Sequence, residues 1–309
     1  MPRRRSVRQR TNARRAAWAI FGSAVIVAFA AGYFLGTRTR SAPQAATSAA
    51  PPASVRPEAV GEEAPRRQPT AGVPRATPPV VPPGQGARVA LVIDDLGRRV
   101  EDVSDFAELG VAISYGVLPF ESRTAQVVEA LRRRGGEILC HLPMEPSNGA
   151  DPGPGALTRR MNRQELVQAT EWALDAIQDA VGVNNHMGSQ LTADREVMSA
   201  IVEVLDQRRL FFLDSRTSSE TVAYQTAREL GLPAAERQVF LDPQSGPETV
   251  REQFARLLEL ARRRGAAIAI GHPHPSTLVV LREEVPRAVA AGYEFVPVSA
   301  LVERSPSPG

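Results

Sequence analysis

The stretch VALVIDDLG, residues 89–97, joins a five-residue apolar run to two adjacent acids and a glycine. A short, unbroken apolar run is typical of a strand that is buried on both faces of a parallel sheet. Asp94 and Asp95 follow it directly, so they are predicted to lie at the carboxyl end of that strand. In parallel α/β folds the loops at these ends form the active face. The stretch therefore predicts both a fold class and the position of a site.

Similar apolar runs recur downstream and alternate with helix-period segments, which is the pattern of βα units. Strands are expected at residues 89–93, 112–117, 137–140, 181–184, 210–213, 267–270 and 295–298, with a weaker one at 239–241. Helices are expected at residues 100–109, 123–134, 163–180, 194–208, 219–230, 248–263 and 278–290. Seven or eight such strands can close into a barrel or lie as a doubly wound sheet. We expect an α/β domain at residues 88–303 built as a parallel barrel, closed or incomplete.

Upstream of this domain, residues 16–37 carry no charge and read AAWAIFGSAVIVAFAAGYFLGT. Roughly 20 apolar residues cross a hydrocarbon core of about 30 Å, so this segment is predicted to be a transmembrane anchor, in preference to a cleaved signal peptide. Residues 1–15 form a tail with seven arginines, which predicts a cytoplasmic N-terminus by the positive-inside rule. Residues 38–87 are rich in Pro and Ala and are expected to be a disordered linker, and residues 304–309 a short tail. The expected setting is a single-pass protein of the bacterial inner membrane with its folded domain in the periplasm.

The distribution of charge excludes a nucleic-acid binder. The chain is formally +3, but residues 88–309 hold 24 arginines against 31 acids, a formal charge of about −7. An acidic domain repels a polyanion, so the basic isoelectric point comes from the segments before the domain. A neutral or amino-sugar polymer is for the same reason the expected partner, rather than an anionic one.

Polar residues that are rare in strands occur where the predicted strands end. Asp94 and Asp95 follow the first strand, and further strands end at His141, at His186, at Asp214 with Ser215, and at His272 with His274. These are the four histidines of the chain, and none occurs elsewhere. Asp and His at one mouth suit a divalent ion, most simply Zn²⁺, which takes three protein ligands in catalytic sites. A carboxylate could then act as a base and a histidine as an acid, so the pattern predicts a metal-dependent hydrolase.

Other catalytic classes lack their motifs. The sequence contains no Gly-x-Ser-x-Gly elbow and no Gly-rich phosphate loop. Cys140 is the single cysteine, so no intrachain disulfide can form and no disulfide partner is expected. Its position before His141 on a strand predicts a buried, inert thiol that points away from the site.

Five segments resemble the divergent polysaccharide deacetylases, distant relatives of the metal-dependent carbohydrate deacetylases. They are VALVIDDLG (89–97), LCHLPMEP (139–146), NNHMGS (184–189), FLDSRTS (212–218) and AIGHPHP (268–275). The resemblance covers residues 88 to about 303. It implies a distorted parallel β/α barrel, a zinc cofactor, and removal of acetyl groups from an envelope polysaccharide or a peptidoglycan-like glycan.

The resemblance also implies roles for individual residues. Asp94 matches the base and Asp95 a metal ligand, His141 matches the first metal histidine, and His272 or His274 would be the acid. Glu145 stands where the relatives carry a second metal histidine. Either Glu145 is an oxygen ligand or His186 completes the site, and His186 is favoured.

Structural interpretations stay open beside these roles. Asp94 and Asp95 could cap a helix, His186 could shape a turn, and Asp214 with Ser215 could form either a substrate-side contact or a hydrogen-bonded turn. The departure at Glu145 also leaves an alternative function open. In that alternative the domain keeps the deacetylase fold but is a weak or inactive protein that binds glycan and organises the envelope.

Overall fold

The structure is a computed structural model that describes residues 86–303. The predicted basic tail, the transmembrane anchor, nearly all of the linker and the final tail lie outside the described residues. Among the helices of residues 86–303, none has both the length and the apolar character that a membrane span requires.

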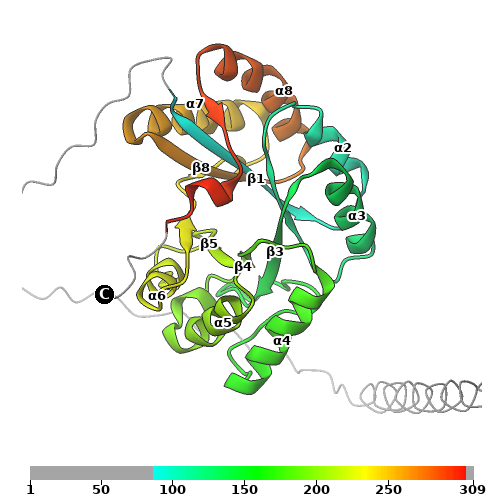
Figure 1. Cartoon of the computed structure of the whole chain (residues 1–309), viewed down its shortest axis with the longest axis vertical. Coiled ribbons are helices and arrows are strands. Elements are labelled where there is room, and N and C mark those ends of the chain that lie inside the picture. Colours follow the sequence, from blue (N-terminus) through cyan, green and yellow to red (C-terminus); the bar gives the residue numbers. More distant parts are fainter. Residues whose placement is uncertain (1–85, 304–309) are drawn as a thin grey trace, which may run out of the picture. The chain divides into compact units, whose positions relative to one another are not determined.

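The described residues form a single parallel sheet that curls into a half-barrel (Figure 1). Its strands are β1 (Arg88–Leu96), β2 (Ser114–Val117), β3 (Glu137–Met144), β4 (Gly182–Met187), β5 (Phe211–Asp214), β6 (Ala234–Glu236), β7 (Val239–Phe240), β8 (Ala266–Gly271) and β9 (Glu294–Phe295). The strand order is β6-β5-β4-β3-β2-β1-β8-β7, with β9 paired to the start of β1. The two outermost strands, β6 and β7, follow each other in sequence but pair with different neighbours. The expected parallel β/α barrel is therefore confirmed in an open form.

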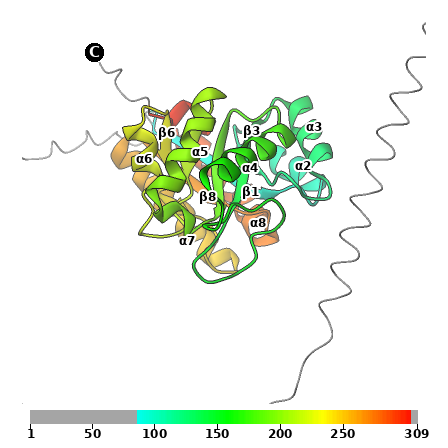
Figure 2. The same ribbon diagram turned by 90° about the horizontal axis from the view of Figure 1, so that it is seen from below.

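Helices cover the outside of the curled sheet (Figures 1 and 2). They are α2 (Glu101–Ala107), α3 (Thr124–Arg134), α4 (Arg163–Ala176), α5 (Arg195–Gln207), α6 (Ala223–Glu229), α7 (Pro247–Arg264) and α8 (Pro275–Ala290), with 3-10 turns η1 (Leu191–Ala193) and η2 (Val298–Leu301). Local chemistry fixes several ends. Asn162 and Glu165 form a capping box at the start of α4, and the Asp194 side chain caps α5. Gly265, in a left-handed conformation at φ 82°, terminates α7.

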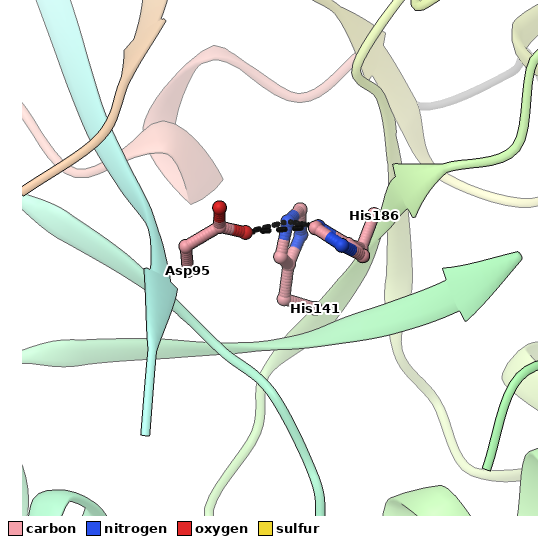
Figure 3. A group of neighbouring side chains, drawn as sticks. All are labelled: Asp95, His141 and His186. Carbon is pink, nitrogen blue, oxygen red and sulfur yellow. Dashed lines mark hydrogen bonds and ion pairs between the residues drawn. The ribbon is translucent and has the colours of Figure 1, made fainter. Parts of the chain in front are cut away.

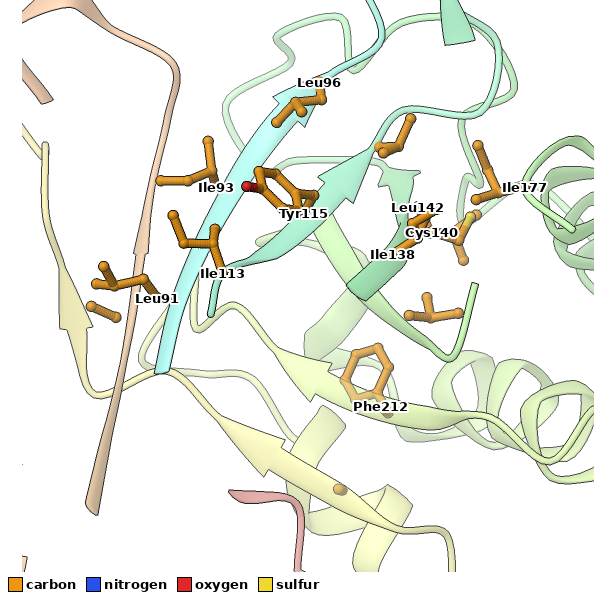
Figure 4. Close-up of a cluster of buried hydrophobic side chains, with 14 of the residues drawn as sticks. Leu91, Ile93, Leu96, Ile113, Tyr115, Ile138, Cys140, Leu142, Ile177 and Phe212 are labelled. Carbon is orange, nitrogen blue, oxygen red and sulfur yellow. The ribbon is translucent and has the colours of Figure 1, made fainter. Parts of the chain in front are cut away.

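The first strand packs on both of its faces, as its unbroken apolar run predicts. Leu91 and Ile93 belong to the large cluster beneath the helices (Figure 4). Ala90 and Val92 belong to a second cluster, with Ile270 of β8, on the inside of the half-barrel. Because side chains alternate along a strand, each strand has one set of residues that points inward. This inward set leads directly to the site.

Cys140 belongs to the outward set of β3. Its side chain is fully buried in the cluster beneath the helices, and its thiol lies 3.9 Å from the Ala173 carbonyl oxygen in α4 (Figure 4). Burial raises the pKa of the thiol to about 12. The prediction of a buried thiol that faces away from the site is confirmed.

Candidate metal centre

The candidate site lies where the inward-facing sets of the strands run out at their carboxyl ends. On β1 the inward residues Ala90 and Val92 lead to Asp94, and on β3 Leu139 leads to His141. The same two-residue step leads to Ser215 after β5 and to His272 after β8. On β4 it joins Asn184 to His186. Strand periodicity alone thus brings these polar side chains to one place.

Asp95 reaches the site by a different route, since a regular strand would point it outward. Its backbone adopts a left-handed conformation with φ 59°, which turns the side chain inward. Aspartate tolerates this region better than most residues. Both acids face the mouth as predicted, but the strand continues to Leu96, so Asp95 is turned inward by an irregular register between Ile93 and Leu96 and not by a turn after the strand.

Asp95, His141 and His186 form a compact cluster (Figure 3). The Oδ1 atom of Asp95 lies 2.8 Å from Nδ1 of His186 and 3.2 Å from Nε2 of His141. The two nitrogens are 3.1 Å apart. The three side chains come from three different strand ends, so only the folded domain assembles them.

The geometry and the donor set of this cluster fit a metal ion. Asp95 Oδ1 is buried and makes no hydrogen bond within residues 86–303, although both nitrogens lie close to it. Ligands bound at about 2.0–2.1 Å to a tetrahedral zinc ion are about 3.3 Å from each other. The observed separations of 2.8–3.2 Å are close to that value. One carboxylate and two imidazoles are also the donor set that zinc prefers.

Electrostatics keep this carboxylate ready to bind a cation. Burial acts to raise the pKa of Asp95, but its contacts with His141 and His186 outweigh burial and hold that pKa well below its ordinary range. Burial acts to lower the pKa of His141, and the charges of Asp94 and Asp95 outweigh it and raise that pKa. Asp95 is therefore ionised at neutral pH.

The amide of Asn184 connects Asp94 to His141. Its Nδ2 donates to both carboxylate oxygens of Asp94, at 2.9 and 2.8 Å, and its Oδ1 lies 3.0 Å from Nδ1 of His141. Because an ionised carboxylate can only accept hydrogen bonds, the amide nitrogen must face Asp94. The amide oxygen then accepts the Nδ1 proton of His141, so in the neutral ring, the form that binds a metal ion, the lone pair is on Nε2 and faces Asp95.

Gly116 on β2 makes room for this pair. A Cβ atom at Gly116 would lie 2.0 Å from Oδ1 of Asp94 and 3.3 Å from Oδ1 of Asn184. Any larger residue would displace the carboxylate. The glycine is thus a sequence requirement of the site and not of the backbone, because its φ lies outside the left-handed region.

Two further loop residues have left-handed backbones beside the cluster, Met187 at φ 52° and Arg216 at φ 50°. Asn185 bridges the two loops, because its Nδ2 donates to the Met187 carbonyl and its Oδ1 accepts from the Ser215 backbone N–H. The Thr217 hydroxyl also donates to the Met187 carbonyl. Uncommon conformations held by specific bonds are typical of functional sites.

His272 is paired with an acid that the sequence interpretation missed. The Asp242 carboxylate accepts hydrogen bonds from Nδ1 of His272 at 2.9 Å, from its backbone N–H at 2.7 Å, and from the Thr277 hydroxyl at 2.7 Å. Burial acts to lower the pKa of His272, but this bond and the charges of Asp242, Asp95 and Asp94 outweigh it and raise the pKa to about 9. Burial likewise acts to raise the pKa of Asp242, and His272 more than offsets it. Nε2 of His272 lies 4.0 Å from the Asp95 carboxylate.

The other predicted residues lie outside the cluster of Asp95, His141 and His186; His274 forms a second group of ligand atoms with Asp242 and His272. His274 is exposed at the start of α8, outside the cavity lining, so the geometry favours His272 for the acid. Glu145 faces away from the cluster, since its carboxylate accepts the Arg159 backbone N–H at 2.7 Å. The Asp214 carboxylate accepts from Arg216, Thr221 and Tyr224, which makes it a turn and helix anchor. Ser215 lines the cavity, and its hydroxyl oxygen lies 3.3 Å from Nδ2 of Asn184.

A cavity of about 350 Å³ opens over the cluster. Its wall is formed by Asp94, Asp95, His141, Asn185, His186, Met187, Ser215, Arg216, Thr217, Arg237, Phe240, Ile270 and His272. The cavity therefore places a three-ligand centre, a second carboxylate and a histidine–aspartate pair around one space. That arrangement can hold a metal ion and move protons on either side of a small substrate group.

Comparisons with known proteins identify the family and the fold of this domain. A family model described as divergent polysaccharide deacetylase matches residues 91–302. An uncharacterised protein of Haemophilus influenzae is 35% identical over 196 residues, which are 63% of this chain and 70% of that one. The uncharacterised protein YibQ of Escherichia coli is 35% identical over 223 residues, 72% of this chain and 68% of that one. A crystal structure of an uncharacterised protein from Agrobacterium tumefaciens shares the fold, with TM-score 0.66 and 24% identity over 73% of this chain and 93% of that one.

Proposed function

The chain belongs to the divergent polysaccharide deacetylase family, and from that premise we propose that it is a metal-dependent carbohydrate deacetylase acting on a cell-envelope glycan. The observation that carries the proposal is the cluster of Asp95, His141 and His186 at the floor of a cavity, with Asp94 and His272 beside it. A three-ligand centre with an open side is typical of hydrolytic zinc sites.

Asp95, His141 and His186 would hold the metal ion, which we take to be Zn²⁺. A divalent ion there supplies Lewis acidity, which polarises the acyl carbonyl and makes water more acidic. Asn184 fixes the ring orientation of His141 by accepting its Nδ1 proton. In this proposal His186 takes the place that the family pattern gives to a second histidine at the position of Glu145.

Asp94 would act as the general base. Its carboxylate lines the cavity and is only 1% exposed, and both of its oxygens accept from Asn184. A carboxylate has about four acceptor positions, so positions remain to take a proton from water. The donated amide hydrogens fix the orientation of the carboxylate plane.

His272 would act as the general acid. Against the effect of burial, the hydrogen bond and the charge of Asp242 raise the pKa of His272, which favours the protonated imidazole that an acid needs before it donates. Asp242 holds Nδ1, so Nε2 is the atom that faces the cavity and would protonate the leaving amine or alkoxide. Thr277 fixes Asp242 in turn.

The size of the cavity suits a single acetylated sugar unit with its neighbours outside. A volume of about 350 Å³ lies at the low end of the usual range for small-molecule sites, about 300–1,000 Å³. We also propose that residues 16–37 anchor the protein in the membrane and that the folded domain lies in the periplasm. The linker would then let the domain reach the envelope glycan.

The alternative is a glycan-binding protein without turnover. Its main support is Glu145, which stands where the relatives carry a metal-binding histidine. The position of His186 weakens that argument, because it supplies a third ligand atom 3.1 Å from His141. The retained Asp94, His272 and Asp242 also favour the enzyme.

The proposal is tested by acetate release from acetylated envelope glycans, using the full chain loaded with zinc. We expect release by the wild type, and a loss of at least about 100-fold in Asp94→Asn, the usual effect of removing a general base. Asp94→Asn should still bind zinc, because Asp94 is not a ligand. Zinc binding without release by the wild type, on peptidoglycan and on other acetylated polysaccharides, would instead support the alternative.

A further inference from the structure

Arg237 is a cation of the cavity wall that has no acidic partner. Two arginines line the cavity, and the other, Arg216, forms an ion pair with Glu236 at 3.2 Å. Within residues 86–303, no carboxylate oxygen lies within 4.0 Å of a nitrogen of the Arg237 guanidinium. The proposed reaction makes no use of this side chain.

The guanidinium is nevertheless held firmly. Its Nε donates to the Ser215 carbonyl at 2.6 Å and one Nη to the Arg216 carbonyl at 2.7 Å. Its carbon lies 4.9 Å from the centre of the Phe240 ring, a cation–π contact. The remaining Nη group has no hydrogen-bond partner among the described residues. A group fixed on one edge and free on the other is preorganised for a ligand.

The nearest acids do not form an ion pair with Arg237 in the structure. Asp94 and Asp214 are close enough to influence Arg237 electrostatically, but Asp94 is bonded to Asn184 and Asp214 to its own turn. Burial lowers the pKa of Arg237, and the charges of Asp214 and Asp94 only partly offset this. Burial of a charged group without a partner is unfavourable, so an anion bound in the cavity would offset the desolvation cost of the Arg237 guanidinium.

The planar guanidinium edge is best matched by a carboxylate, which it can bind through two parallel N–H···O bonds. We propose that Arg237 is the binding group for a carboxylate of the substrate, so that the glycan on which the enzyme acts carries an acidic sugar. The inference rests on the proposed function, because it takes this cavity as the substrate site. It departs from the expectation of a neutral polymer, which followed from the net charge of the whole domain and not from the charge at the site.

A purely structural role is the competing explanation, since Arg237 also braces the carbonyls of the loop after β5. Three variants of the full chain separate the two. Arg237→Met removes charge and donors, Arg237→Gln keeps one donor group without charge, and Arg237→Lys keeps charge without the two-carbonyl brace. Arg98→Met is the matched control, because Arg98 influences Asp95 electrostatically but pairs with Glu121 outside the cavity.

The experiment measures binding by calorimetry to zinc-loaded protein, with three probes on the same sugar. They are N-acetylglucosamine, its carboxylate-bearing lactyl ether N-acetylmuramic acid, and N-acetylglucosamine 6-phosphate. We expect the wild type and Arg98→Met to bind the carboxylate sugar at least about tenfold more tightly than the neutral sugar. That ratio should fall to near one in Arg237→Met and Arg237→Gln and be largely restored in Arg237→Lys. A preference that survives in Arg237→Met would be attributed to the metal and would overturn the proposal.

Equal binding of the neutral and carboxylate sugars by the wild type would also overturn it, as would a clear preference for the phosphate. If Arg237→Met does not fold, Arg237→Gln and Arg237→Lys decide alone. A structural brace predicts equal effects of Gln and Lys on all three probes. Acetate release is measured in parallel. Selective binding without any release would refute the proposed deacetylase while leaving the role of Arg237 intact.

Discussion

One amide, that of Asn184, holds both the proposed base and a proposed metal ligand. The residue is fully buried, and its bonds to Asp94 and His141 use its donor and its acceptor on opposite sides. Water cannot replace either the amide NH2 group or the amide oxygen, because no part of the side chain is exposed. A substitution that removes only the donor or only the acceptor should therefore separate the effect on the proposed base from the effect on the proposed metal ligand.

Asn184→Asp keeps an oxygen facing His141 but removes the donor to Asp94 and places two carboxylates side by side. We expect zinc affinity to stay within about tenfold while acetate release falls at least about 100-fold, because the base is disturbed. Asn184→Leu removes both bonds, and zinc affinity should fall by about 10–100-fold as well. The paired readouts are zinc titration and the rate of release.

Thr170→Val is the control for this pair, since Thr170 is a buried polar residue of α4 whose hydroxyl bonds within its own helix. It should change neither quantity. Equal losses of zinc affinity and of release in both Asn184 variants would show that the amide has a packing role only.

Gly116→Ala tests the space that the glycine leaves for Asp94. The added Cβ would lie 2.0 Å from a carboxylate oxygen, and relief of such a clash in a packed interior costs about 1–3 kcal/mol of unfolding free energy. Gly136→Ala is the matched control, because its Cβ would meet only side-chain carbons of Leu131 and Tyr115 at 3.2 Å or more. Urea unfolding should show a loss for Gly116→Ala well above that for Gly136→Ala. Similar losses for the two would mean that Asp94 moves aside without strain.

Among the elements, strand periodicity explains why most of the candidate site could be predicted. Every second residue of a strand points inward, and continuing this alternation past the apolar residues of each strand leads to Asp94, His141, His186 and His272. Asn184 could have been found in the same way, since it precedes His186 by two residues on β4. It was missed because an amide has no chemical signature of its own.

Other parts of the structure had no such signal. Asp242 and Arg237 follow the short strands β7 and β6, and β6 was missed because Ala234–Glu236 lacks an apolar run. The last strand was predicted at residues 295–298, but it ends at Phe295, since Pro297 cannot donate to a sheet ladder. Each predicted helix is present, with ends displaced by a few residues.

The loop between β3 and α4 bears on whether Glu145 or His186 completes the proposed centre. Glu145 anchors that loop through the Arg159 backbone N–H, whereas His186 lies in the cluster. We predict that Glu145→Gln, which can still accept that bond, binds zinc within about twofold of the wild type. His186→Gln should lose at least about 100-fold, because a ligand is removed. The reverse order of affinities in zinc titrations would assign the ligand to Glu145.

At the scale of the whole molecule, net charge and local charge differ. Residues 88–309 are about seven units negative, yet the cavity wall carries Arg216, Arg237 and a protonated His272 against Asp94 and Asp95. A bound divalent ion would make this space positive within an acidic domain. The electrostatic potential inside the cavity, and not the net charge of the domain, governs which ligands enter the cavity.

Metal binding should also stabilise the domain as a whole, because its three ligands come from strand ends far apart in sequence and are not gathered in the unfolded chain. Free zinc at about 1,000 times its dissociation constant adds about 4 kcal/mol to the unfolding free energy. For a domain of this size that corresponds to a rise of about 8–16 °C in Tm. A chelator should reverse the rise, and His186→Gln should show none of it in a thermal scan. An equal rise in His186→Gln would place the bound zinc elsewhere.

The central claim, that Asp95, His141 and His186 form a metal centre, is tested most directly by titrating Zn²⁺ into the metal-free full chain. The account predicts one tightly bound equivalent per chain in the wild type and in Glu145→Gln, and none of comparable affinity in His186→Gln. Absence of a tight site in the wild type, or a tight site that persists in His186→Gln, would contradict it.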